Sequence, residues 1–175
     1  MRRKIVLLAA LLGLTYSALL AQDIQTTEPE RRQIAENVFV DHSQMIGMVG
    51  NMDSLLIKEN EQISSIFESD GRLIEEVYCI DFDKDGNSEY LIKMDSGGSG
   101  AYKDLCVLKK ADKEYKPIWE NTLSEAEVVI RTSDEAPLAV FVKHVDKSTD
   151  KPQNKVIGLT YSDGKVSEYY PESID

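Results

Sequence analysis

The sequence predicts an α+β fold, in which N-terminal helices precede an antiparallel, meandering β-sheet of about seven to eight strands. Before Gly71, apolar residues recur at intervals of three, four and seven, which is the period of an amphipathic helix. After Gly71 the period changes to two, as in a half-buried strand. Turn residues then recur every eight to fourteen positions or so with no helical segment between them, which favours antiparallel pairing.

The first residues have the pattern of an export signal. Residues 2–4 are basic, and residues 5–14 form an apolar run that is too short and interrupted for a comfortable membrane span. Cleavage is expected after Ala21, with Ser17 or Ala18 as alternative sites, and an uncleaved anchor is the other interpretation. No cysteine follows the cleavage region, so the pattern is not that of a lipoprotein. We therefore expect a periplasmic or secreted protein without stable membrane insertion after signal cleavage.

Charge limits the possible partners. The chain has 20 basic and 31 acidic side chains, and residues 1–21 contain three of the basic ones, so the mature chain carries a net charge of −14. This charge opposes binding to nucleic acid or anionic lipid. It suits calcium, a basic partner, or simply an acidic soluble surface. The remaining 154 or so residues are enough for one domain, predicted over residues 31–175 after a polar leader over residues 22–30.

The helical part is expected to begin near Glu30. A second helix is expected to begin at Asp53, a good N-cap residue, and a further turn or two to end at Asp70-Gly71. The apolar faces of these helices would contain Ile34, Val38, Met45, Val49, Met52, Leu55, Leu56, Ile57, Ile63, Ile66 and Phe67.

The second half of the chain reads as strands separated by turns. Asp163-Gly164 is a two-residue hairpin signal, and residues 112–114 form another short turn. The expected strands are Leu73 to Phe82, Glu89 to Met94, Tyr102 to Lys109, Tyr115 to Trp119, Glu125 to Arg131, Leu138 to His144, Lys155 to Tyr161 and Val166 to Tyr170.

The two cysteines, Cys79 and Cys106, lie in strands with another expected strand between them. An export signal allows a disulfide. In a simple meander the two outer strands are about 10 Å apart, too far for a bridge. Two buried free thiols are therefore favoured over a disulfide.

A loop rich in carboxylates precedes the strand that begins at Glu89, with four acids within nine residues. Calcium needs several hard oxygen ligands at about 2.3–2.6 Å, and alternate residues of a tight loop can direct carboxylates at one centre. Gly86 permits the chain reversal. The predicted metal ligands are Asp81, Asp83, Asp85, Asn87 through its backbone carbonyl, and Glu89. The loop is not an EF-hand, because Ile92 stands at its twelfth position and strand formers flank it.

This pattern, Asp81-x-Asp83-x-Asp85-Gly86-x-x-Glu89 entering the strand YLI, resembles the calcium loop of FG-GAP and VCBS-type, integrin-propeller-like proteins. The resemblance implies a loop between two strands of a β-blade that holds calcium through the aspartates, a backbone carbonyl and the acid at the ninth position. It covers about 30 residues, Glu76 to Leu108, and the single loop departs from the repeated array of the family. The alternative is a solvated acidic turn without an ion, since Asp, Asn and Gly are common turn formers.

Other candidate sites are weaker. Adjacent residues of one helix point in different directions, so Asp41-His42-Ser43 cannot form a catalytic relay, and the two histidines and two cysteines lack zinc-ligand spacing. Gly97 to Gly100 reads as a flexible hairpin loop or a partner-binding loop beside the metal site. The aromatics of the late strands, including Trp119, suit packing or a partner surface.

Three functions follow from these observations. The first is a non-enzymatic exported module whose loop binds calcium in a stabilising role and whose sheet face or glycine-rich loop meets an unknown protein or glycan. The second is an acidic inhibitor or immunity-type protein that neutralises a basic partner. The third is a hydrolase, for which no residue stands out.

Overall fold

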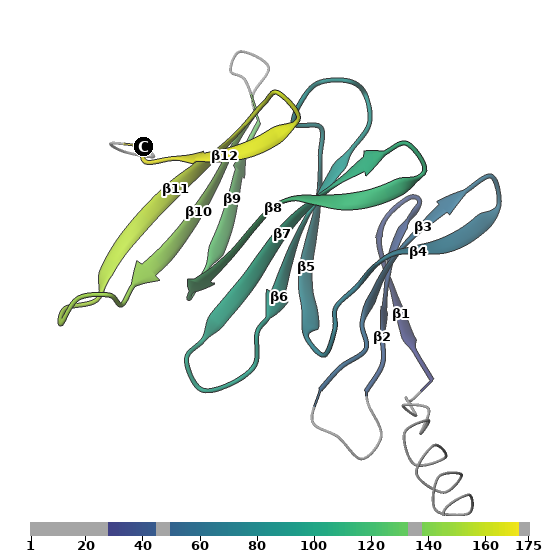
Figure 1. Ribbon diagram of the computed structural model, residues 1–175. Helices are drawn as coiled ribbons and strands as arrows, with labels where there is room; N and C mark the ends of the chain where they lie inside the picture. Colours follow the sequence, from purple (N-terminus) through teal and green to yellow (C-terminus); the bar gives the residue numbers. More distant parts are fainter. Residues whose placement is uncertain (1–27, 45–49, 133–137, 172–175) are drawn as a thin grey trace, which may run out of the picture.

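The computed structural model describes residues 28–44, 50–132 and 138–171. Within these residues the protein is all β, with twelve strands in three four-stranded antiparallel sheets (Figure 1). We call them the N-terminal sheet (β1–β4), the central sheet (β5–β8) and the C-terminal sheet (β9–β12). In each sheet the strands are neighbours in chain order, so each sheet is a simple meander.

The strands have the following bounds. The N-terminal sheet contains β1 (Glu30–Ala35), β2 (Val38–His42), β3 (Ser54–Glu59) and β4 (Gln62–Glu68). The central sheet contains β5 (Leu73–Ile80), β6 (Glu89–Asp95), β7 (Tyr102–Ala111) and β8 (Glu114–Ser124). The C-terminal sheet contains β9 (Glu127–Arg131), β10 (Ala139–Asp146), β11 (Gln153–Ser162) and β12 (Lys165–Tyr169).

The predicted α+β class is therefore wrong. Most of the described residues expected to form N-terminal helices lie in the four strands of the N-terminal sheet, and the strands expected in one later sheet form two sheets, the central and the C-terminal one. Two residues of the predicted apolar helix faces, Met45 and Val49, lie outside the described residues.

The error at β3 and β4 has a local cause. Asn60 and Glu61 both have positive φ, 49° and 64°, and join strands in which Glu59 pairs with Gln62. This is a two-residue hairpin turn that contains no glycine, so the usual signal is missing. Asp70 and Gly71, with φ of 53° and 91°, turn the chain between two strands rather than ending a helix.

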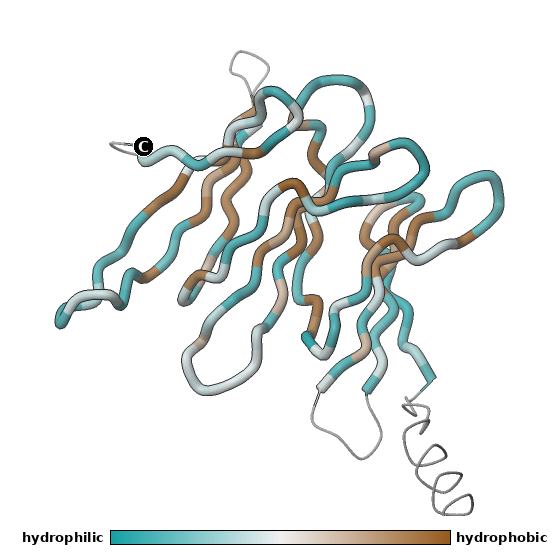
Figure 2. The backbone as a smooth tube through the Cα atoms, viewed as in Figure 1, coloured by the Kyte–Doolittle hydropathy of each residue, from teal (hydrophilic) through white to brown (hydrophobic). Residues whose placement is uncertain are grey.

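The central sheet is buried on both faces, and this arrangement explains its sequence. Leu91 of β6 belongs to a hydrophobic core shared with the C-terminal sheet, and its neighbours Tyr90 and Ile92 belong to one shared with the N-terminal sheet. Residues that alternate along a strand point to opposite faces, so β6 and β7 need near-continuous apolar runs. Figure 2 shows hydrophobic segments on strands of all three sheets.

The eight strands expected after Gly71 are all present, although β8 continues to Ser124 instead of ending near Trp119. The Asp163-Gly164 hairpin is also present, with φ of 51° and 79° between the paired residues Ser162 and Lys165.

Both cysteines are free, as expected, and β6 lies between their strands. Cys106 is buried as expected, whereas Cys79 is exposed. No helix in the described part of the chain is long and apolar enough to span a membrane.

Candidate metal centre

The acidic loop connects the two adjacent strands β5 and β6 of the central sheet. The last residue of β5, Ile80, pairs with Glu89, the first residue of β6, so the sheet fixes both ends of the loop. Gly86 has a φ of 87°, and a Cβ there would meet no atom within 4 Å, so backbone conformation and not crowding favours glycine.

Three of the five predicted ligands come together. Asp81, Asp83 and Glu89 each offer one carboxylate oxygen, and these oxygens lie within 4.8 Å of one another. Glu89 is buried, with 1 % of its surface exposed, whereas the two aspartates are partly exposed. The cluster thus opens to solvent on its aspartate side and has its glutamate in the protein interior.

Backbone amides hold the carboxylates in place. The amide of Asp85 donates to Asp81 Oδ1 (3.1 Å) and Asp83 Oδ1 (3.2 Å), and the amide of Gly86 donates to Asp81 Oδ2 (3.1 Å). The amide of Phe82 donates to Glu89 Oε2 (2.8 Å). These bonds orient the cluster, and Asp83 Oδ2 and Glu89 Oε1 accept none of them.

Asp85 and Asn87 interact mainly with each other. Asp85 Oδ1 accepts hydrogen bonds from the Asn87 amide (2.7 Å) and from Asn87 Nδ2 (3.1 Å), and both residues are exposed. The bond from the Asn87 amide is the main reason why the pKa of Asp85 lies below its ordinary value. Asp85 and Asn87 therefore remain predicted ligands.

Sequence reasoning missed Lys109, from β7. Its ammonium lies 2.6 Å from Asp83 Oδ2, 2.5 Å from Glu89 Oε1 and 3.4 Å from Asp85 Oδ2. Burial lowers the pKa of Lys109, but the hydrogen bonds to Asp83 and Glu89 outweigh that effect and raise it above its ordinary value. A cationic group is thus present among the carboxylates.

The chemistry of the cluster fits a hard cation. Its donors are carboxylate oxygens, the ligands that calcium prefers, and the loop directs oxygens of three acids to one place. The ammonium lies where cationic charge is favourable. Ion binding by Asp83 and Glu89 would require this ammonium to move.

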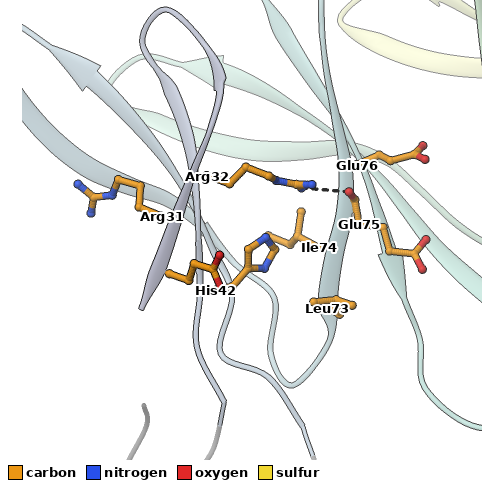
Figure 3. Close-up of a pocket in the computed structure, with 8 residues that line it drawn as sticks. Arg31, Arg32, His42, Leu73, Ile74, Glu75 and Glu76 are labelled. Atoms are coloured by element: carbon orange, nitrogen blue, oxygen red, sulfur yellow. Dashed lines mark hydrogen bonds between the residues drawn. The ribbon is translucent and has the colours of Figure 1, made fainter. Parts of the chain in front are cut away.

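A second cluster of polar residues lies beside a cavity between the N-terminal and central sheets (Figure 3). The imidazole of His42 lines this cavity, and its Nδ1 is 2.7 Å from Oδ2 of the fully buried Asp53. The same oxygen accepts a bond from the Ile74 amide (2.8 Å), whereas Asp53 Oδ1 has no hydrogen-bond partner. Arg32 crosses the cavity to donate to the Glu75 carbonyl (3.0 Å), as Figure 3 shows.

This second cluster connects two sheets, because Asp53 directly precedes β3 and Ile74 belongs to β5. His42 uses Asp53 as its carboxylate partner, whereas Asp41 pairs with Arg31 and the hydroxyl of Ser43 donates to the Met52 carbonyl. The side chains of Asp41, His42 and Ser43 thus have separate partners, and these residues lie at the end of a strand and not on the expected helix.

Comparisons of the chain with protein-family models, with curated proteins and with solved structures give no match. The function has to be inferred from the residues of the chain itself.

Proposed function

We propose that the protein is an exported, non-enzymatic β-sheet module that binds one calcium ion in the β5–β6 loop and interacts with a protein or a glycan. The ion has a structural role, since the loop joins two strands of the sheet that packs against both others. The observation that carries the proposal is the approach of oxygens from Asp81, Asp83 and Glu89 to within 4.8 Å of one another.

Electrostatics supports a divalent ion at this place. Exposed carboxylates at such separations repel by about 1 kcal/mol per pair in water, and more where solvent is excluded. The Lys109 ammonium, one positive charge, is shared by three acids. Calcium supplies two charges and is bound by six to eight oxygens, so it offsets more of the repulsion.

Thermal denaturation of the mature chain tests the proposal. We expect millimolar calcium to raise the melting temperature and a chelator to reverse the rise, because an ion that binds only the folded state stabilises it by about 2.7 kcal/mol at one hundred times its dissociation constant. Asp83→Asn should abolish most of this response.

Asp163→Asn is the matched control. It also removes one carboxylate from a turn, and Asn tolerates the positive φ of 51° at that position. Its calcium response should equal that of the wild type. A wild-type melting temperature that is the same in calcium and in chelator would refute calcium binding.

A further inference from the structure

We infer that Lys109 competes with the calcium ion: its ammonium holds the loop together in the ion-free protein and leaves when calcium binds. This inference rests on the calcium binding proposed above and adds an intramolecular regulator of the same site.

The loop presents carboxylate oxygens that accept no bond from a backbone amide. Backbone amides already occupy Asp83 Oδ1 and Glu89 Oε2. The remaining oxygens of these two acids, Asp83 Oδ2 and Glu89 Oε1, are the ones that contact the Lys109 ammonium, at 2.6 and 2.5 Å. An ion that both acids bind through these two oxygens displaces the ammonium, because two cations that close together repel each other. Binding is therefore an exchange of one cation for another.

Burial explains why the ion-free loop needs such a substitute. Glu89 is almost entirely buried, and a buried carboxylate without a partner is strongly destabilising. Lys109 reaches it from the neighbouring strand with only 20 % of its own side chain exposed. The loop therefore keeps its form at low calcium concentration, and calcium affinity is reduced by the work of removing the ammonium.

An aromatic ring next to Lys109 can interact with the displaced ammonium. Its nitrogen lies 5.3 Å from the ring centroid of Tyr161, on β11 of the C-terminal sheet. A cation over an aromatic face is attracted to it without occupying a carboxylate. The displaced side chain can keep this contact, or move outward to solvent, while calcium holds the acids.

Calcium titration of Lys109→Met tests the inference, with Lys110→Met as the matched control. Lys110 is the next residue of the same strand, and it also pairs with an acid, Glu59 (2.6 Å), and lies 5.7 Å from the centroid of a tyrosine ring, Tyr115. Lys109→Met removes the charge-assisted hydrogen bonds between the competing ammonium and the acids, so it should tighten calcium binding at least about tenfold. The calcium dissociation constant of Lys110→Met should stay within about twofold of the wild-type value.

The side chain itself gives a second readout that needs no variant. In the wild type, the ε-amino resonances of Lys109 should shift with calcium in proportion to occupancy, while those of Lys110 should not. This measurement also covers the case in which Lys109→Met fails to fold without calcium.

The outcomes separate the two proposals. If the wild type and Lys109→Met bind calcium equally well and the Lys109 resonances do not move, the competition is refuted and calcium binding stands. If neither protein binds calcium, both proposals are refuted. Tighter binding by both lysine variants would mean that overall charge and not displacement sets the affinity, and would also overturn the inference.

Discussion

Two buried carboxylates of this protein are stabilised in different ways. Glu89 in the loop has both oxygens paired, one with the Phe82 amide and one with Lys109. Asp53 between the sheets is equally buried, but one oxygen accepts bonds from His42 and Ile74 and the other has no partner. Lys109 reaches Glu89 on a flexible stem from an adjacent strand, whereas Asp53 is connected to a backbone amide of another sheet.

This difference distinguishes an exchangeable interaction from a fixed one. A lysine can leave Glu89 if another cation replaces it, because no backbone atom has to move. The Ile74 amide is fixed in the backbone of β5, and its bond to Asp53 joins the central sheet to the residue that precedes β3. We therefore expect substitutions at Asp53 to affect stability irrespective of calcium, and substitutions at the loop to affect stability and calcium response together.

The largest effect is expected for Asp53→Ala. It removes the acceptor for the Ile74 amide and for His42 and leaves an unfilled volume, so the free energy of unfolding should fall by about 3–5 kcal/mol. Urea denaturation in chelator measures this loss. Asp41→Ala, which breaks an ion pair with the exposed Arg31, is the control and should cost about 1 kcal/mol or less. Equal losses in the two variants would show that Asp53 does not connect the sheets.

A smaller loss is expected for Glu89→Gln. The amide oxygen can still accept a hydrogen bond from the Phe82 amide, but the neutral side chain no longer forms an ion pair with Lys109. The free energy of unfolding should therefore fall by about 1.5–3 kcal/mol. The calcium-dependent rise in melting temperature should disappear as well. Asp53→Ala, by contrast, should keep that rise if it remains folded. A normal calcium response in Glu89→Gln would remove Glu89 from the ligand set.

The sequence was sufficient to predict the strands of the central and C-terminal sheets, because short segments of alternating or continuous apolar residues, separated by turns such as Asp163-Gly164, are typical of strands. It failed in the N-terminal sheet for a physical reason. Ile34 and Val38 are four residues apart, the spacing of one helix face, but the structure places them on two different strands, β1 and β2. The hairpin turn at Asn60 and Glu61 gave no glycine signal to decide between helix and strand.

The candidate site also contains residues that the sequence could reveal and residues that it could not. The acidic loop is local in sequence, so spacing alone brought Asp81, Asp83 and Glu89 to attention. Lys109 depends on strand register: Tyr90 pairs with Leu108, which places Glu89 across from Lys109. The contact between His42 and Asp53 joins a strand end to the start of another strand and has no local pattern. Such partners become visible only when the pairing of strands is known.

The smallest effect concerns the pH dependence of the contribution that Lys109 makes to stability. The pKa of Lys109 is raised above the ordinary value of 10.5 by its bonds to Asp83 and Glu89, against the opposing effect of burial. A group whose pKa is raised in the folded state stabilises the protein fully at pH values below its unfolded pKa, and this contribution is lost as the pH rises through its folded pKa.

The stability difference between the wild type and Lys109→Met in chelator should therefore stay constant from about pH 6 to 9 and shrink only above about pH 10.5. Urea denaturation of both proteins across this pH range measures the difference, and a loss of the Lys109 contribution already near neutral pH would show that another titrating group holds the loop.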